Sequence, residues 1–474
     1  MLWYFGRRLL LFVPTLLIIS LVAFGLSRLA PGDPIQCGTQ DLLEHGLGAN
    51  SYESARTRYR EEARRKGLDK PPFYLAIRPA AYPDTLYRIL ERYQRQTLRK
   101  LIDQYGNWPQ IQAYAQRLED WERQLYQLPR ERSRDAQIRL ERDLRLLKLS
   151  YRQERVESYF VKMQALIEAD SLLREDLGPA WQALREAYTQ ILDEATPERL
   201  LQPALHWYGT DNQYHFWLFN FLRGDFGYSC RNGQAVADRL GGALWWTLIM
   251  SLPAILLSYL IAVPIGIRAA TRRDSWFDRI STLILFLLYS LPSFWVATLL
   301  IVFVTTAEYG AWLDLFPTSG VGELPDEAPF WARLGERAHH LILPVFCMTY
   351  ASLSFISRQM RTGVLYVLGQ DFIRTAHAKG LPPRRVVWRH VFRNALFPLI
   401  TLVALILPGV ISGSVIVELI FNIPGMGRET ISAIQARDWP VVYTILMLSA
   451  ILTLLGNLLA DLLYTLADPR VSYD

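Results

Sequence analysis

Cysteine and histidine are scarce in this sequence, with three and seven respectively in 474 residues. Cys37, Cys230 and Cys347 have no metal-ligand or redox spacing and the histidines are scattered, so no metal site is predicted. The phosphate-binding loop G-x-x-x-x-G-K-[ST] is absent, which excludes ATP binding of the usual kind. The hydrolase motifs G-x-S-x-G and H-E-x-x-H are also absent. The chain is therefore predicted not to be an enzyme, and its energy must come from a gradient or from another subunit.

Apolar residues make up 51% of the chain and fall in long blocks, which is typical of a membrane protein. A bilayer core of roughly 30 Å requires about 20 apolar residues in a helix. Six runs with few or no charges predict spans: Leu9–Ala30, Leu244–Ile267, Ile280–Thr305, Leu341–Ile356, Ala395–Phe421 and Val441–Leu466. The first run is longer than the core of a signal peptide and no small-residue cleavage site follows it, so we interpret it as a retained anchor.

Charge differs between the connecting segments, which predicts their orientation. Lys and Arg are concentrated at the N-terminal tip, between spans two and three, and between spans four and five, so these segments are placed in the cytoplasm. The loop between spans three and four is acidic and is placed outside. Both termini are then cytoplasmic. The net charge of +6 follows from this sidedness and, without a base-stacking or groove-reading motif, does not indicate a nucleic-acid partner.

The largest polar segment, about residues 31–242, lies between the first two spans and is placed outside the membrane. Apolar residues recur there every three or four positions, which puts them on one face of a helix. The clearest run comprises Trp108, Ile111, Ala115, Leu118, Trp121, Leu125 and Leu128. Pro109 and Pro129 would begin or break helices, which predicts antiparallel hairpins in a small bundle. The predicted fold class is all-α, a six-span membrane protein with an extracytoplasmic helical bundle between spans one and two.

The stretch FIRTAHAKGLPPRRVVWRHVFRNALFP, residues 372–398, is strongly basic although apolar runs flank it. Gly380 permits a break between two short cationic helices, and paired prolines begin the second. Small residues at Thr375, Ala376 and Ala378 would let another protein approach the first helix closely. A basic amphipathic helix resting on anionic membrane lipid would have the same pattern. The pattern alone leaves these two interpretations open.

Several motifs resemble those of one family. RTAHAKG followed by RNALFP is similar to the coupling motif of ABC importer membrane subunits, in which E-A-A, three residues and G form the helix that sits in the ATPase groove. Further motifs look like those of the dipeptide, oligopeptide and nickel permease family, in the same order: RRLLLFVPTLLIISLVAFGLSRLAPGDP, GLDKPP, LRGDFGYS, ELIFNIPGMGR and NLLADLLYTLADPR. The resemblance covers essentially everything except about residues 78–213.

This resemblance implies the type I ABC importer permease fold in a bacterial inner membrane. It also implies a heterodimer with a second permease, two cytoplasmic ABC ATPases that bind ATP and Mg, and an extracytoplasmic substrate-binding protein, with no cofactor in this chain. Residues 1–77 would hold the first span and the start of the outside loop, 78–213 a helical insertion, and 214–474 the permease core with a coupling helix at about 370–382. Peptides are the expected substrate on family frequency, with nickel or another small solute as the alternative.

The resemblance also assigns residues. The coupling motif falls on Asp371, Arg374, Thr375, Ala376, Lys379 and Gly380. Arg374 departs from the general importer glutamate, but Arg-Thr-Ala is similar to the version in this subfamily.

We propose as a hypothesis that the insertion enlarges the surface that receives the binding protein.

Polar residues inside the predicted spans are costly to bury, and we assign structural or gating roles ahead of substrate contact to Glu418, Asn457 and Asp461. A turn at the outer end of span five, part of an outer gate, is expected from Pro424, Gly425 and Gly427. Cys37 and Cys230 would both lie outside, near the ends of spans one and two. A disulfide between them is a hypothesis for an oxidising compartment.

Two other classes of protein share some of these features. A membrane signalling or mechanotransmission protein would use the outside bundle as a sensor, but it would not require a coupling helix between spans four and five with the other motifs in order. A gradient-driven transporter would show internal repeats or broken helices with intramembrane ion sites, which we do not see in the sequence.

Overall fold

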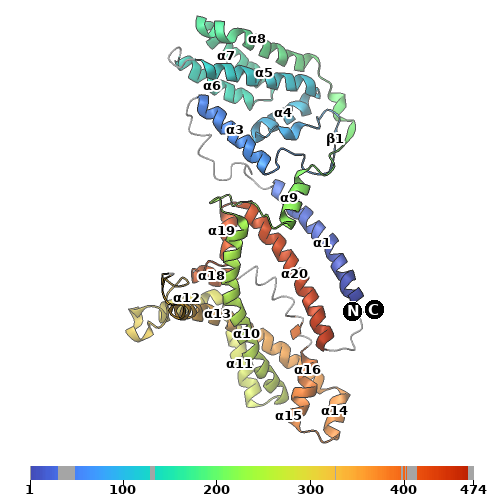
Figure 1. Cartoon of the computed structure of the whole chain (residues 1–474), viewed down its shortest axis with the longest axis vertical. Helices are drawn as coiled ribbons and strands as arrows, with labels where there is room; N and C mark the ends of the chain where they lie inside the picture. The colour runs from blue at the N-terminus through green and yellow to red at the C-terminus, as the bar shows by residue number, and fades with distance from the viewer. Residues whose placement is uncertain are drawn as a thin grey trace. The chain divides into compact units, whose positions relative to one another are not determined.

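The computed structural model describes residues 2–29, 49–128, 134–325, 327–396, 399–400, 402 and 414–467. The chain divides into two compact units, Pro31–Gly224 and Met1–Ala30 together with Asp225–Asp474. Helices make up nearly all of the regular structure, and the described strands form a single two-stranded ribbon (Figure 1). The predicted mostly helical fold is therefore confirmed.

The unit Pro31–Gly224 is a helical bundle with a short β-ribbon at its base. Its helices are α3 Ala49–Arg65, α4 Arg92–Tyr105, α5 Trp108–Gln127, α6 Arg134–Lys148, α7 Gln153–Ala169, α8 Ser171–Asp193 and α9 Gln213–Leu222. Helix α5 packs along α8, α6 packs against α7, and α7 against α8 (Figure 1). Pro109 lies in the first turn of α5, as predicted, because a helix does not need the N–H that proline lacks at that position. Pro129 lies outside the described residues.

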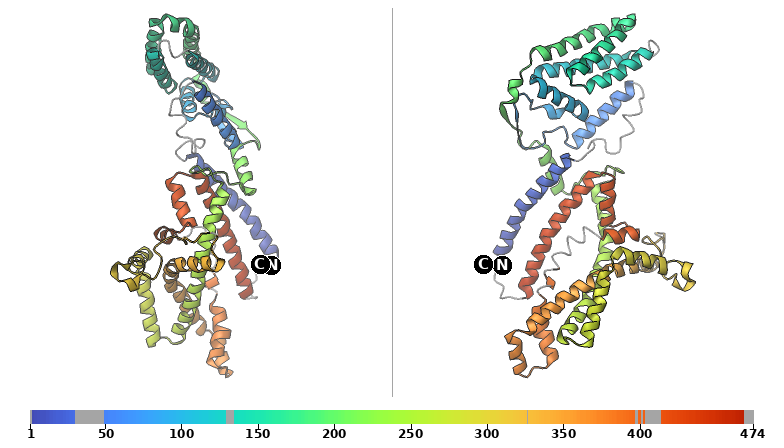
Figure 2. Two further views of the ribbon diagram at one scale, coloured as in Figure 1. Left: turned by 60° about the vertical axis from the view of Figure 1, so that its left-hand side comes forward. Right: turned by 180° about the vertical axis from the view of Figure 1, so that it is seen from behind.

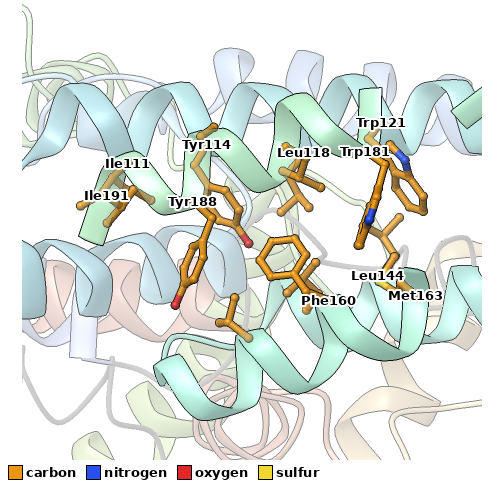
Figure 3. Close-up of a cluster of buried hydrophobic side chains, with 14 of the residues drawn as sticks. Ile111, Tyr114, Leu118, Trp121, Leu144, Phe160, Met163, Trp181, Tyr188 and Ile191 are labelled. Carbon is orange, nitrogen blue, oxygen red and sulfur yellow. The ribbon is translucent and has the colours of Figure 1, made fainter. Parts of the chain in front are cut away.

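Aromatic side chains fill the interior of this bundle (Figure 3). The ring centres of Trp121 on α5 and Trp181 on α8 are 5.3 Å apart, and Phe160 on α7 lies 5.3 Å from Trp181. Tyr114 and Tyr188 pair in the same way at 5.6 Å. Each large side chain buried from water contributes about 1.5–3 kcal/mol to the free energy of folding, so the aromatic contacts between α5, α7 and α8 hold the bundle together.

The ribbon joins the two ends of the segment that forms the bundle. Strand β1, Leu75–Pro79, pairs antiparallel with β2, Pro203–Trp207, and Pro79 lies opposite Pro203. Helical periodicity did not predict these strands, because their partners are far apart in the sequence. As a result, residues 80–202 begin and end side by side, which is the geometry of an insertion.

The other unit contains the long apolar helices. Four described helices are long and apolar enough to cross a membrane: α1 Leu2–Leu29, α10 Val236–Thr271, α13 Phe330–Leu368 and α20 Trp439–Ala467. They correspond to four of the predicted spans, with Ala30 of the first span outside the described residues, and α13 is longer at both ends than the run that predicted it. Helix α10 packs along α13, and α1 packs along α20 (Figure 2).

The predicted third span is not one straight helix. The chain forms α11, Trp276–Ser290, and α12, Ser293–Val304, with an angle of 88° between them. Pro292 lies at the break and Leu291 is extended, because proline has no N–H to donate and disfavours helical geometry in the residue before it. The single helix predicted over Ile280–Thr305 is therefore wrong, and this bent pair crosses the membrane as a broken span or re-enters on the same side.

Most of the predicted fifth span lies outside the described residues. Its described flanks are the short helices α16, Phe392–Ala395, and α18, Val415–Ile420, and α19, Met426–Gln435, follows. The total of six spans stays a prediction.

Small residues let α10 and α13 approach closely. A Cβ atom added at Gly266 would lie 2.6 Å from the Ser357 carbonyl oxygen, so no larger residue fits there. Nearby, the Ser258 hydroxyl donates to the Thr349 carbonyl at 3.3 Å. Small residues and side-chain hydrogen bonds are typical of helix contacts in a membrane, where apolar burial does not drive association. The segment that follows α13 packs back against α13.

Candidate coupling and outer-gate sites

The basic segment that follows α13 forms a sequence of short helical pieces. They are α14 Asp371–Ala378, α15 Pro383–Arg385, the π-helical turn Val386–Val391 and α16 Phe392–Ala395. The predicted cationic helix, break and second cationic helix are therefore all present.

Helix α14 has one buried side and one exposed side. Ile373 and Ala376 are 2% and 7% exposed and belong to a core cluster that includes residues of α10 and α13. Thr375 and Lys379 are exposed, and so are Asp371 and Arg374, whose charged groups lie 3.5 Å apart. An ion pair this exposed contributes little to stability. The charged side of α14 is thus open for contact with another molecule.

Ala376 was expected to let a partner approach α14, and this part of the prediction is wrong. Its side chain faces the interior, three residues after Ile373 on the same helix face. Of the three small residues, only Thr375 and Ala378 are exposed and would let a partner protein approach α14 closely. Ala376 instead fixes α14 to the core.

Gly380 ends α14 in the way the sequence predicts. Its φ is +74°, a left-handed conformation that favours glycine. Its N–H donates to the His377 carbonyl at 2.9 Å, and the Leu381 N–H donates to the Ala376 carbonyl at 3.4 Å. These bonds satisfy carbonyls that the helix end would leave free, and they redirect the chain into the second basic piece.

A second site surrounds Glu418, which is completely buried. Its carboxylate accepts hydrogen bonds from the Thr247 hydroxyl of α10 at 3.1 Å and from the backbone N–H groups of Arg428 at 2.9 Å and Ser414 at 3.3 Å. The Thr247 oxygen in turn accepts from the Met426 N–H at 2.8 Å. Glu418 and Thr247 therefore satisfy free N–H groups in the first turn of α19, where a negative charge is favourable.

The turn before α19 has room only for glycine. A Cβ atom at Gly425 would lie 2.5 Å from the Glu418 carboxyl carbon, and one at Gly427 would lie 2.8 Å from the Val415 backbone. Pro424 is half-buried in the same turn. The predicted turn is present, and these contacts show why Glu418 and the glycines occur together in one motif. A role as an outer gate stays a prediction.

The sequence did not predict the ionic cluster around Asp438, which lies three residues after the end of α19. Asp438 is completely buried and accepts from the Cys230 N–H at 2.9 Å, from Arg239 Nη1 at 2.9 Å and from the Ser229 hydroxyl. Arg239, in the first turn of α10, is 8% exposed and also donates from Nε to Glu429 at 2.7 Å. A buried arginine with two carboxylates and a hydroxyl satisfies charges that would otherwise be costly in the interior.

This cluster had little signal in the sequence. Ser229 lies in the LRGDFGYS motif, but Arg239 and Asp438 are 199 positions apart and no local pattern relates them. Together with Glu418 and Thr247, the cluster connects both ends of α19 to α10. The two helices are therefore held as one piece.

The remaining predicted residues lie apart from these sites. Asp461 on α20 is nearly buried and pairs with Arg8 on α1, and its structural or gating role stays a prediction. Asn457 is exposed in this chain, so the expected burial is not observed. Cys37 lies outside the described residues, and its pairing with Cys230 stays a prediction.

Comparison with known proteins identifies the family. A family model described as the inner membrane component of binding-protein-dependent transport systems matches residues 262–473. The chain is 40% identical over 262 residues to the oligopeptide transport system permease protein AppB of Bacillus subtilis (strain 168), which covers 55% of this chain and 80% of that protein. The chain belongs to this permease family.

Other relatives of this permease agree. It is 36% identical over 279 residues to the oligopeptide transport system permease protein OppB of Mycobacterium tuberculosis (strain CDC 1551 / Oshkosh), covering 58% of the chain and 86% of that protein. It is also 36% identical over 258 residues to a putative peptide transport system permease protein of Brucella abortus (strain 2308), covering 54% and 79%. The resemblance drawn from the motifs is confirmed, and the permease is a multi-pass membrane protein of a binding-protein-dependent system. The matched residues include the basic segment from α14 to α16 and helix α19 but not the helical bundle.

Proposed function

We propose that this chain is a membrane subunit of an ATP-driven peptide importer and forms the translocation pathway with a second, similar permease. The observation that carries this proposal is the exposed charged side of α14, held on a buried base of Ile373 and Ala376. The names of the relatives, which refer to oligopeptide and peptide transport, support the substrate class. We place the protein in a bacterial inner membrane with both termini in the cytoplasm.

In this proposal, two ABC ATPases bind ATP and Mg and hydrolyse ATP, and this chain carries no cofactor and performs no catalysis. Each ATPase would receive one coupling helix in a groove. Ile373 and Ala376 of α14 belong to the same core cluster as residues of α10 and α13, so a push on the exposed side of α14 would move these helices together. Arg361 of α13 makes two hydrogen bonds of 2.9 Å with Asp278 of α11, so α11 would move together with α13.

Helix α19 would lie at the outer end of the helices that move with α14. Its two ends are bonded to α10, through Glu418 with Thr247 and through Asp438 with Arg239. Motion received at α14 would therefore reach the outer face through α10. We propose that α19 and the turn before it act as the outer gate.

We further propose that the helical bundle lies outside the membrane and enlarges the surface for an extracytoplasmic substrate-binding protein. The ribbon supports a clean deletion, because Pro79 and Pro203 already lie opposite each other. Replacing residues 80–202 by a short turn should impair uptake while leaving assembly and basal ATP hydrolysis intact. Unchanged uptake would contradict this role.

The first experiment is to purify the tagged chain gently from native membranes and identify the proteins that accompany it. A second permease, ATPases with phosphate-binding loops and a binding protein should be recovered. Uptake of labelled peptides by the reconstituted complex would confirm the substrate class, whereas uptake of nickel alone would contradict it. Absence of any ATPase would overturn the proposal.

The coupling surface has a matched pair of variants. Thr375→Arg places a bulky charge on the exposed side of α14 and should abolish coupled uptake by preventing ATPase docking. Thr210→Arg makes the same change at an exposed position of the bundle unit and should leave ATPase docking unchanged. Equal ATPase recovery with both variants would exclude α14 as the docking helix.

A further inference from the structure

The β-ribbon has an apolar face that no part of the described chain covers. Leu75 lies opposite Trp207 and Ile77 lies opposite Leu205. Alternate residues of a strand point to the same side, so these four side chains share one face. Their exposed fractions are 42%, 72%, 71% and 70%, respectively. The intervening residues Ala76, Arg78, Ala204 and His206 are less exposed. The ribbon therefore presents its apolar side outward, the reverse of the usual arrangement.

The ribbon is attached to the aromatic helix α9. The Tyr208 N–H, directly after β2, donates to the Tyr74 carbonyl before β1 at 2.8 Å, and the Gln213 N–H of α9 donates to the Pro71 carbonyl at 2.9 Å. The rings of Tyr74 and Tyr214 lie 6.0 Å apart at the same junction. The ribbon and α9 therefore form one connected element.

Helix α9 is rich in aromatic residues, and Trp and Tyr are enriched at membrane–water interfaces. Its sequence QYHFWLFNFL contains no Asp, Glu, Lys or Arg, and Phe219 and Leu222 are 46% and 74% exposed. Cations lie directly at its aromatic rings, with the Arg223 guanidinium 4.0 Å from the centre of Phe219 and the Lys70 ammonium 5.2 Å from that of Phe216. Exposed aromatic side chains with adjacent Lys and Arg are typical of the membrane–water boundary.

Candidate membrane helices precede and follow this unit in the chain. The candidate membrane helix α1 precedes the unit and ends at Leu29, and the next one, α10, begins at Val236, soon after α9 ends at Leu222. The apolar face of the ribbon has only the Trp207 indole as a hydrogen-bonding group. A lipid surface needs no polar partners, whereas a specific protein contact is usually anchored by several.

We propose that the ribbon face formed by Leu75, Ile77, Leu205 and Trp207 rests in the headgroup region of the membrane and holds the bundle unit at the bilayer surface. An exposed apolar patch of this kind marks an interaction site. The proposal requires only that the chain is a membrane protein. It does not depend on peptide as the substrate or on the docking of α14.

Site-specific photocrosslinking of the full-length protein in native membranes tests this surface. The photoreactive residue p-benzoylphenylalanine replaces Ile77 or Leu205, and the same replacement at Val161 and Ile138 provides controls. Val161 on α7 and Ile138 on α6 are 70% and 54% exposed on the same unit, away from the ribbon. All four positions are at the surface, so the replacement should not prevent folding.

After irradiation, phospholipid adducts should form at residues 77 and 205 and remain at background at residues 161 and 138. Mass spectrometry of the labelled peptides separates lipid adducts from protein adducts. Crosslinks from 77 and 205 to a binding protein or a second permease would overturn the proposal, as would the absence of any adduct there. Uptake by the unmodified complex is measured separately, so failure of this proposal is distinct from failure of the transport function.

Discussion

Removing the carboxylate of Asp438 tests whether the buried ionic cluster holds α19 in place. In Asp438→Ala, the Ser229 hydroxyl and the Cys230 N–H lose their acceptor, and Arg239 Nη1 loses its carboxylate partner and keeps only the Ser229 oxygen at 2.7 Å. Arg239 is only 8% exposed, so water cannot replace the lost partner easily. Glu429 still accepts from Arg239 Nε at 2.7 Å, and part of the charge stays paired.

The expected loss of stability is about 3 kcal/mol. Breaking a buried ion pair by removing one partner costs about 3–5 kcal/mol, and the remaining Glu429 contact places this case at the lower end. At ~2 °C for each kcal/mol, the midpoint of thermal unfolding of the purified chain should fall by about 6 °C. Adding Arg239→Met should recover part of the loss, because it removes the charge left without its main partner.

An exposed ion pair provides the control. Asp120 and Arg123 in the bundle lie 3.8 Å apart with side chains 52% and 57% exposed. Asp120→Asn should therefore change stability by less than about 0.5 kcal/mol. If Asp438→Ala and Asp120→Asn shifted the midpoint equally little, the cluster would not connect α19 to α10 as we infer.

Three further predictions concern the turn before α19 and the bundle. Gly425→Ala should lower the free energy of unfolding by about 1–3 kcal/mol, because its Cβ would lie 2.5 Å from the Glu418 carboxyl carbon. Gly242→Ala in α10 is the control, because its Cβ would meet no atom within 4 Å and should not lower the unfolding midpoint. Trp181→Ala removes a side chain that is 3% exposed and should lower the free energy of unfolding of the bundle by about 3–5 kcal/mol. This loss should appear as faster proteolysis within residues 81–200, and an unchanged digestion pattern would argue against the aromatic core. Burial raises the pKa of the Tyr188 phenol above its usual value of about 10. The stability that the neutral phenol contributes is therefore complete below about pH 10 and is lost as the pH rises further, which should lower the unfolding midpoint at alkaline pH. Measured from pH 8 upward, this fall in the unfolding midpoint should be smaller in Tyr188→Phe.

Local patterns in the sequence determined the helices, the membrane class and the family motifs. Apolar runs predicted the positions of α1, α10, α13 and α20, because a bilayer requires about 20 consecutive apolar residues. Spacing of three and four residues predicted the buried side of α5, and Gly380 predicted the end of α14. These features depend on neighbours in the chain and can be recognised without knowing what packs against them.

Only the tertiary structure decided which side chains meet. Ala376 occupies a position of the coupling motif, yet the core around α14 turns it inward and leaves Thr375 exposed. The sequence showed Glu418 as a costly charge, but not that Thr247 and the first turn of α19 would satisfy it. Partners such as Asp438 with Arg239, or Leu75 with Trp207, are distant in the chain. Their contacts depend on strand register and helix rotation, which no local pattern specifies because they are set by the packing of the whole unit.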